Sequence, residues 1–352
     1  MKMSVHRFDF ADATPLDVAT AALRAPGARP TEFRSREATT PWLTVVMPVH
    51  YGEHFLPATL ASAAAQPTDG VEFLIYNSGN DGGIARQIAK RFAGRLDIKW
   101  RDTPELPSWT AKTNLGVREA RATHVAMLHQ DDLWLPGHLA TIRRAITENP
   151  EAVLSIAPSF FADPTGGMVG RWNLPFQPGL VSSEDFLSTL LVQSSIAIPS
   201  PVARRDAWLA AGGMDDDLWF SADWDMYLKL AAQGHIAVRS ETTTAFRIHR
   251  GSLTMTGSRR PGSLRPQLEQ VLERHLGHLP AHSRRRIERL ARASIEVNCA
   301  LADASCGDKS ALLNAAIRLL RLGPVGAMRY IRQSRIIDRV VPRLRLALAG
   351  NL

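Results

Sequence analysis

Leu43-Thr-Val-Val-Met-Pro-Val49 is apolar at nearly every position, which is the pattern of a strand covered on both faces of a sheet. A helical stretch, Phe55–Ala65, separates it from a second apolar strand at Val71–Tyr76. Helix and strand continue to alternate up to the strand Thr123–Leu128, as in consecutive βαβ units. We therefore expect an α/β fold whose mostly parallel sheet is flanked by helices, with a ligand site where the carboxyl ends of these strands meet.

Further elements are expected along the same domain. The helices are predicted at Ile84–Ala93, Thr113–Ala120 and Ala222–Gln233, and the strands at Leu96–Trp100, Val153–Ala157, Ser200–Arg204, Ile236–Arg239 and Thr244–Ile248. We expect the last two strands to form a closing pair.

The composition separates the chain into regions. Of the 352 residues, 45% are hydrophobic and 22% are charged, which is close to the globular average and excludes wholesale disorder. The net charge of +8 comes from the end of the chain, where residues 261–352 hold 16 Lys and Arg against 7 Asp and Glu. We expect an N-terminal extension over 1–40, an α/β domain over 41–258 and a basic, all-α region over 259–352.

The basic region reads as amphipathic helices in which arginine and apolar residues interleave. They are predicted at Pro266–His275, Ala281–Ala304, Lys309–Arg321 and Val325–Val341, with breaks at Pro280, Gly307, Pro324 and Pro342. Such helices can pack on the α/β domain or on a second copy, or they can lie on an anionic membrane. Nucleic acid is not an expected partner, because no row of aromatic side chains accompanies the charge.

The two cysteines and the absence of long apolar runs bear on location. Cys299 and Cys306 lie about 10 Å apart along a helix, beyond the roughly 7 Å between Cα atoms that a disulfide spans, so we expect both to be reduced. No run approaches the roughly 18 apolar residues of a membrane span. The first residues lack the apolar core of a signal peptide. We expect a cytoplasmic protein, peripheral to the inner face of the membrane if its basic helices bind lipid.

An acidic pair follows the strand Thr123–Leu128 directly, in His129-Gln-Asp-Asp132. Adjacent carboxylates at the edge of a sheet repel each other unless a cation compensates, and hard oxygen ligands suit Mg²⁺ or Mn²⁺. The alternative is that Asp131 or Asp132 caps the next helix, whose first turn would hold Pro136.

Two later stretches carry further candidates. Asp223 and Asp225 fall at the start of a predicted helix, where a carboxylate stays ionised and can act as a general base, or simply stabilises the helix end. In Phe246-Arg-Ile-His-Arg250, His249 could bind a metal or a phosphate, and Arg247 or Arg250 a diphosphate. A structural role for this histidine is the alternative.

The order of these stretches resembles a family 2 glycosyltransferase of the GT-A, Rossmann-like fold, over about Pro41–Thr254. The matching motifs are the first strand Leu43–His50, the nucleotide-base loop Glu72–Gly82, the helix start Thr113–Gly116, the metal motif His129–Asp131, the base motif Ser221–Asp225 and the late histidine motif Phe246–His249. Three positions depart from the family pattern: His129 replaces the first metal-motif Asp, Asn77 the base-loop Asp, and Ala222 the Glu of the base motif.

The resemblance implies an inverting, metal-dependent transfer of one sugar from a nucleotide-diphosphate sugar to a hydroxyl of a sugar or lipid-linked acceptor, in the assembly of surface polysaccharide, glycolipid or glycoconjugate. A processive synthase is not implied, because the Gln/Arg-x-x-Arg-Trp element is missing. Asp223 would be the base, and Asp131, with His249 and His129, would hold Mn²⁺ or Mg²⁺. The donor would contact Val49, His50, Asn77, Asp81, Asn114, Asp131, Arg247 and Arg250.

Two alternatives remain. The three departures are compatible with a non-catalytic sugar-nucleotide binder or scaffold of the same fold. A nucleotidyltransferase shares the sheet, but His50-Tyr-Gly-Glu53 is not the glycine-rich basic phosphate loop that it needs.

Overall fold

The computed structural model describes residues 40–258, 262–308 and 310–350, so the expected N-terminal extension lies, apart from residue 40, outside the described residues. An eight-stranded sheet crosses the α/β domain in the order β3-β2-β1-β4-β10-β6-β11-β9. Its strands are β1 (Leu43–Val49), β2 (Val71–Asn77), β3 (Asp97–Asp102), β4 (His124–Met127), β6 (Leu154–Ile156), β9 (Gly179–Val181), β10 (Val202–Arg204) and β11 (Ile236–Val238).

The sheet is mixed. The β1–β2, β2–β3, β1–β4 and β6–β11 pairings are parallel, whereas β10 runs antiparallel between β4 and β6, and β9 runs antiparallel to β11. The prediction of parallel strands is therefore confirmed for β1, β2, β3 and β4, where helices connect successive strands. It is incomplete for the rest of the sheet, because β10 is antiparallel to both of its neighbours and β9 is antiparallel to β11.

A second sheet of four strands lies beside the first, in the order β5-β12-β7-β8. Its strands are β5 (Leu133–Trp134), β7 (Ser159–Ala162), β8 (Met168–Trp172) and β12 (Thr244–Arg247). The expected closing pair of strands is wrong, because β11 belongs to the large sheet and β12 to the small one. Since β12 pairs with β5, which begins directly after Asp132, this sheet brings the end of the domain back to the acidic residues.

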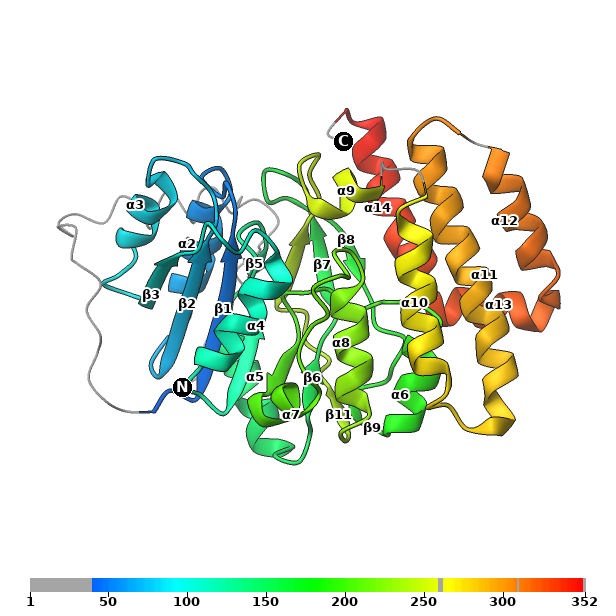
Figure 1. The fold of residues 1–352 in the computed structure, drawn as a ribbon, viewed down its shortest axis with the longest axis horizontal. Coiled ribbons are helices and arrows are strands. Elements are labelled where there is room, and N and C mark those ends of the chain that lie inside the picture. The colour runs from blue at the N-terminus through cyan, green and yellow to red at the C-terminus, as the bar shows by residue number, and fades with distance from the viewer. Residues whose placement is uncertain (1–39, 259–261, 309, 351–352) are drawn as a thin grey trace, which may run out of the picture.

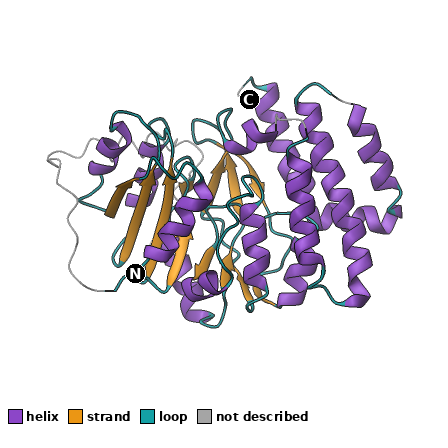
Figure 2. Ribbon diagram, viewed as in Figure 1, coloured by secondary structure: helices purple, strands orange, loops and turns teal. Residues whose placement is uncertain are grey.

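Helices cover both faces of the large sheet (Figures 1 and 2). They are α2 (Leu56–Ala64), α3 (Ile84–Lys90), α4 (Trp109–Glu119), α5 (His138–Glu148), α6 (Ser183–Leu190), α7 (Arg205–Ala210) and α8 (Ala222–Ala231), and α9 (Leu253–Ser258) follows β12. Side chains alternate across β1: Val45 and Met47 enter one core with α2 and α3, and Val46 enters the other with α4 and α8. Both faces are buried, as the continuous apolar run predicts.

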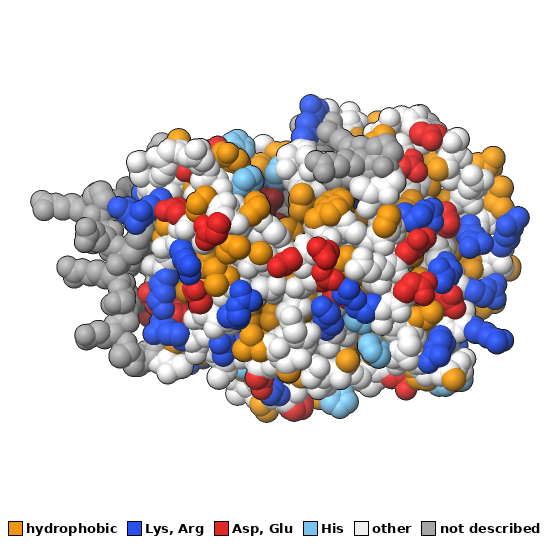
Figure 3. All heavy atoms as spheres, in the orientation of Figure 1, with side chains coloured by type: hydrophobic (Ala, Val, Ile, Leu, Met, Phe, Trp, Pro, Cys, Tyr) orange, Lys and Arg blue, Asp and Glu red, His pale blue; other side chains and the backbone are white. Residues whose placement is uncertain are grey.

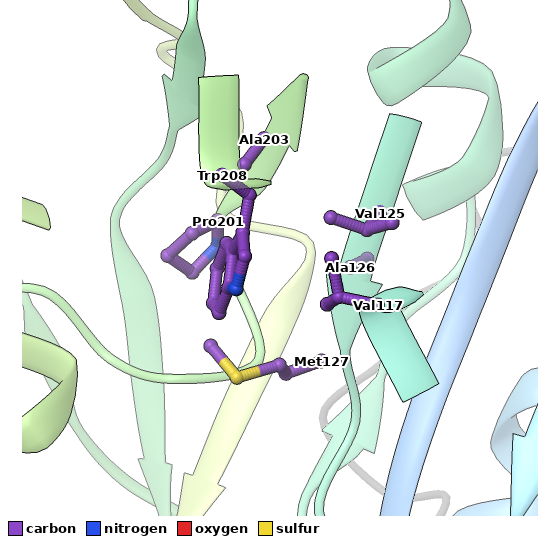
Figure 4. Close-up of a pocket in the computed structure, with 7 residues that line it drawn as sticks. All are labelled: Val117, Val125, Ala126, Met127, Pro201, Ala203 and Trp208. Atoms are coloured by element: carbon purple, nitrogen blue, oxygen red, sulfur yellow. The ribbon is translucent and has the colours of Figure 1, made fainter. Parts of the chain in front are cut away.

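The core holds a small void beside β4, drawn in Figure 4. Its volume is about 10 Å³, no more than a single water needs, and its lining is almost entirely apolar. It is a packing defect, and not a ligand site. The lining residues are Val117, Val125, Ala126, Met127, Pro201, Ala203 and Trp208.

The C-terminal region is helical, as predicted, and stands against the α8 side of the domain (Figure 1). Its helices are α10 (Leu264–Leu276), α11 (Ala281–Ser305), α12 (Ser310–Leu320), α13 (Gly323–Ser334) and α14 (Ile336–Leu348). Neither cysteine forms a disulfide among the described residues. No single described helix has the length and hydropathy of a membrane span, and α12 and α13 meet that standard only as a pair bent by 115°.

The single helix predicted over Val325–Val341 is wrong. The chain breaks at Arg335, which has a φ of 49° and whose guanidinium donates to the Leu174 carbonyl at 2.9 Å. This turn sends α14 back onto β8, where a Cβ on Gly170 would lie 2.5 Å from the Pro342 ring. Pro342 is therefore a packing residue inside α14. The helix break that was predicted at Pro342 is wrong.

Asp225 joins the C-terminal region to the α/β domain. Its carboxylate is fully buried on α8 and pairs with Lys229 at 2.7 Å, and from α10 with Arg274 at 2.9 Å and His275 at 2.8 Å. Burial opposes ionisation, but the hydrogen bonds from His275 and Lys229 outweigh it and lower the pKa of Asp225 to about 2. This charge network fixes α8 against α10.

Asp225→Asn should lower the free energy of unfolding by about 3 kcal/mol, because it removes the charge that pairs with Lys229 and Arg274 and weakens the buried hydrogen bond with His275. Urea denaturation at neutral pH measures this. Asp206→Asn is the matched control: its pair with Arg204 is exposed, so its loss should change stability by less than about 1 kcal/mol. Equal effects of the two substitutions would contradict the assignment.

Candidate functional site

The site is centred on the turn His129–Asp132, here called the acidic turn, which follows β4. Asp131 meets His249, which follows β12, with 2.9 Å between Oδ2 of the carboxylate and Nε2 of the ring. The structure thus brings together two of the residues predicted to hold a metal. Burial works against the ionised form of Asp131, but the hydrogen bond with His249 outweighs it and lowers the pKa of the carboxyl.

The acidic turn offers ligand atoms that no protein group uses. Ligand atoms of His129, Asp131 and Asp132 all lie within 4.8 Å of one another. His129 Nε2 and Asp132 Oδ2 are buried and have no hydrogen-bond partner among the described residues. Burial lowers the pKa of His129 to about 4, so the ring is neutral and keeps a free lone pair. Burial and the adjacent Asp131 raise the pKa of Asp132, and the backbone N–H and the charge of Arg247 oppose the rise.

These donors fit a divalent cation. Two carboxylates and a neutral imidazole are a ligand set that suits Mn²⁺ or Mg²⁺, with the oxygens supplying most of the charge. The capping alternative for this turn is wrong, because α5 begins at His138 with Gly137 at its N-cap and no side chain bonded there. The sequence analysis considered the acidic pair for a cation, but it named Asp131 alone of the two among the metal residues, with His129 and His249.

Arg247 braces the acidic turn from β12. Its backbone N–H donates to Asp132 Oδ1 at 3.1 Å, and its Nε donates to the Asp131 carbonyl at 2.7 Å. A third bond joins Nη1 to the Pro164 carbonyl at 2.8 Å, and the guanidinium lies 4.9 Å from the Phe55 ring centre. The predicted contact of Arg247 with a diphosphate therefore has only Nη2 left for it.

Arg250 lies at the surface, close to the end of the chain. Its Nη2 donates to the Gly350 carbonyl at 3.0 Å, which places the loop after β12 beside the C-terminus of α14. Its predicted contact with the donor diphosphate stays a prediction.

Asp223 and Asp225 share one helix turn but have different surroundings. Asp225 pairs with Lys229 and Arg274 and is hydrogen-bonded to His275, whereas the hydrogen bond that the structure gives the Asp223 carboxylate comes from the neighbouring Trp224 N–H at 2.8 Å. Burial raises the pKa of Asp223 to about 6, and the N–H of Trp224 and the charge of Arg339 oppose the rise. A carboxylate with a pKa near 6 is suited to accept a proton at neutral pH.

Tyr227 links α8 electrostatically to the acidic turn. The Tyr227 side chain, one turn along α8, lies within electrostatic reach of both Asp223 and Asp132. Arg339 reaches Asp223 from α14, and its Nε and Nη1 are buried without a hydrogen-bond partner among the described residues. The C-terminal region therefore contributes a cation to this part of the site. Asp223 does not serve as an N-cap, because α8 has no side-chain cap.

The residues predicted to line the nucleoside pocket mainly shape its loops. His50 and Gln130 exchange two hydrogen bonds, N–H to Oε1 at 2.8 Å and Nε2 to C=O at 3.0 Å, which tie the end of β1 to the acidic turn. Asn77 folds back on Gly79 through both its amide atoms. Asp81 accepts from the first N–H groups of α3.

Val49 and Asn114 are also less open to a ligand than predicted. The Val49 side chain is fully buried. The Asn114 amide is used by the Met214 backbone, from which it accepts at 2.8 Å and to which it donates at 2.8 Å. Asn114 therefore holds the loop that leads to α8, and its predicted contact with the ribose or phosphates stays a prediction.

Lys112 is a site residue that sequence reasoning missed. Its Nζ is buried and donates to the Val49 carbonyl and to Ser78 Oγ, both at 2.8 Å, so it joins the ends of β1 and β2. Burial lowers its pKa to about 8. The predicted helix began at Thr113, whereas α4 begins at Trp109, so Lys112 lay outside the predicted helix. The available signal was a lysine in the first turn of an amphipathic helix, which could have marked Lys112 as a candidate site residue.

Comparison with solved structures supports the fold. The S. aureus TarS 1–349 structure in complex with UDP-GlcNAc aligns with a TM-score of 0.52 and 15% identity, over 82% of this chain and 89% of that one. The mannosyltransferase PcManGT from Pyrobaculum calidifontis, in complex with GDP-Man and Mn²⁺, gives 0.51 and 17%, over 94% of both chains. A longer S. aureus TarS chain aligns with a TM-score of 0.50 and 14% identity over 75% of this chain. The alignment covers 55% of the length of that TarS chain.

At these identities the structural likeness shows the GT-A fold. No curated protein matches this chain. Residues 44–200 match the family model described as Glycosyl transferase family 2, and this stretch contains β1, β2, the acidic turn and β7. Over residues 44–200 the chain therefore matches glycosyl transferase family 2, and its fold is that of GT-A glycosyltransferases.

Proposed function

We propose that this chain transfers a single sugar from a nucleotide-diphosphate sugar to an acceptor hydroxyl, with inversion at the anomeric carbon. The observation that supports this most is that α8 carries a candidate base and the acidic turn carries candidate cation ligands. Asp223 is a carboxylate with no ion-pair partner among the described residues, and burial raises its pKa to about 6. The acidic turn offers three ligand atoms suited to a divalent cation, and Tyr227 of α8 lies within electrostatic reach of both Asp223 and Asp132.

In the proposed reaction, the acceptor oxygen bonds to the anomeric carbon as its proton passes to Asp223. The bond from that carbon to the diphosphate oxygen breaks, and the nucleoside diphosphate leaves from the opposite face. Mn²⁺ or Mg²⁺ held by His129, Asp131 and Asp132, with His249 beside them, would neutralise charge on the departing diphosphate. The brace from Arg247 would keep the acidic turn in place.

The donor class follows from the solved relatives, which were determined with UDP-GlcNAc, UDP or GDP-Man. We propose a UDP- or GDP-sugar as donor and a sugar or lipid-linked acceptor, used in the cytoplasm for surface polysaccharide or glycolipid. The alternative of a non-catalytic binder is tested by incubation with each donor and Mn²⁺, because a transferase slowly hydrolyses its donor to the nucleoside diphosphate and a binder does not.

Asp223→Asn should lower kcat by about 10²–10⁴-fold, because the amide cannot accept the proton, while donor affinity is unchanged. Steady-state kinetics and calorimetric donor titration measure the two quantities. Asp217→Asn, an exposed change in the loop before α8, is the control and should retain activity. Loss of donor binding in Asp223→Asn would instead show a structural role.

The acidic limb of the kcat profile should lie near pH 6, since Asp223 must be ionised to act as a base and is protonated as the pH falls below its pKa. Arg339→Gln removes a positive charge that stabilises the ionised form. This substitution should therefore move the limb to higher pH. A limb near pH 4, or one that stays in place in Arg339→Gln, would contradict the assignment.

Asp131→Ala and Asp132→Asn should each remove the effect of Mn²⁺ on donor binding, because each deletes a proposed ligand. Calorimetric titration of the donor with and without Mn²⁺ measures this effect. Asp206→Asn, away from the acidic turn, should behave as wild type. A Mn²⁺ effect of the same size in Asp132→Asn and wild type would mean that Asp132 is not a ligand.

A further inference from the structure

The last three helices expose an unusual share of apolar surface. Of the 17 large hydrophobic side chains that are exposed among the described residues, 11 lie between residues 310 and 348. Single exposed apolar residues are normal, but a concentration of this kind marks an interaction surface. The surface lies on the C-terminal region, at the opposite end of the molecule from β3 (Figure 1).

The exposed residues follow helical spacing. On α12, Leu313, Ile317 and Leu320 share one face at i, i+4 and i+7, and Leu320 is 78% exposed. On α13, Val325 and Met328 are 72% and 71% exposed, and the same spacing places Arg329 and Arg332 on their face. Each helix thus presents apolar side chains to solvent with arginines at their border.

An arginine-lined groove of about 480 Å³ lies between α11 and α12, next to this apolar face. Arg292 pairs with Glu273 and Glu288, while the other four arginines of the groove have no ion pair among the described residues. Figure 3 shows basic and apolar side chains together along this end of the molecule. The groove is lined by Arg285, Glu288, Arg289, Arg292, Arg318, Arg321 and Leu322.

Charge and composition favour one kind of partner. A second copy would bring like-charged grooves together, which is unfavourable. Single-stranded nucleic acid needs exposed aromatic rings for stacking, and Tyr330, the only aromatic residue after residue 280, is fully buried. An anionic membrane satisfies both features, because its phosphates pair with arginine and its interface accepts apolar side chains.

We propose that α12 and α13, with the arginine groove between α11 and α12, dock this chain on a membrane surface that contains anionic phospholipid. The groove arginines bind headgroup phosphates, and the apolar side chains of α12 and α13 enter the interface. The helices lie on the membrane and do not cross it. This placement goes beyond the proposed transfer reaction and does not depend on it.

The test is cosedimentation of the full chain with vesicles of phosphatidylcholine alone or mixed with phosphatidylglycerol. Binding should require phosphatidylglycerol and weaken with salt. The variants Arg318→Glu/Arg321→Glu and Leu320→Ser/Val325→Ser/Met328→Ser should each bind about tenfold more weakly or less. The matched control Arg91→Glu/Arg95→Glu, on exposed arginines of the α/β domain, should bind as wild type.

Several results would overturn the proposal. They are absence of vesicle binding, equal binding to neutral vesicles, retention of binding by both surface variants, or binding of single-stranded RNA without vesicles. A dimer in light scattering that the apolar variant dissociates, without vesicle binding, would assign the face to a second copy. Thermal unfolding checks the fold of each variant. If a variant is destabilised, the salt dependence of vesicle binding by the wild-type chain tests the proposal in its place. Donor titration is a separate measurement, so failure of docking leaves the transfer reaction standing.

Discussion

The proposed site depends on the contact between Asp131 and His249. The two residues lie 118 positions apart in the sequence, and they meet because β12 belongs to the small sheet, where it pairs with β5 next to the acidic turn. Arg247, two residues before the histidine, then bonds to the backbone of the acidic turn and to Asp132. One short strand pairing therefore sets the position of all the proposed cation ligands.

The two aspartates of α8 show how environment divides similar side chains between structure and chemistry. Asp225 is surrounded by Lys229, Arg274 and His275, and its charge stabilises the contact between domain and C-terminal region. Asp223, two residues earlier, is buried without such partners, and its pKa rises toward the range useful for proton transfer. The network around Asp225 holds α8 rigidly and thereby positions Asp223. The C-terminal helices thus take part in the site as well as in packing.

The sequence was most informative where one pattern of apolar residues extended over a whole strand or helix. The apolar runs of β1 and β2 and their helices were predictable because both faces of the parallel half are buried. Prediction failed at features that depend on tertiary contacts. These are the two-residue strand β5, the reversed strand β10, and the break at Arg335, where a left-handed residue is held by the Leu174 carbonyl. In the site, the motifs indicated Asp131, Asp223 and His249, and the acidic pair included Asp132, whereas Lys112 required knowledge of where α4 begins.

Paramagnetic resonance of Mn²⁺ tests the central claim most directly, which is that residues distant in sequence converge on one cation. The sample is the wild-type chain with Mn²⁺ and a nucleoside diphosphate, compared with His129→Gln and His249→Gln. The account predicts magnetic coupling of the ion to histidine nitrogen in the wild type, and its loss or reduction when a coordinating imidazole is replaced. A bound Mn²⁺ with no nitrogen coupling, or with one that neither substitution changes, would contradict it.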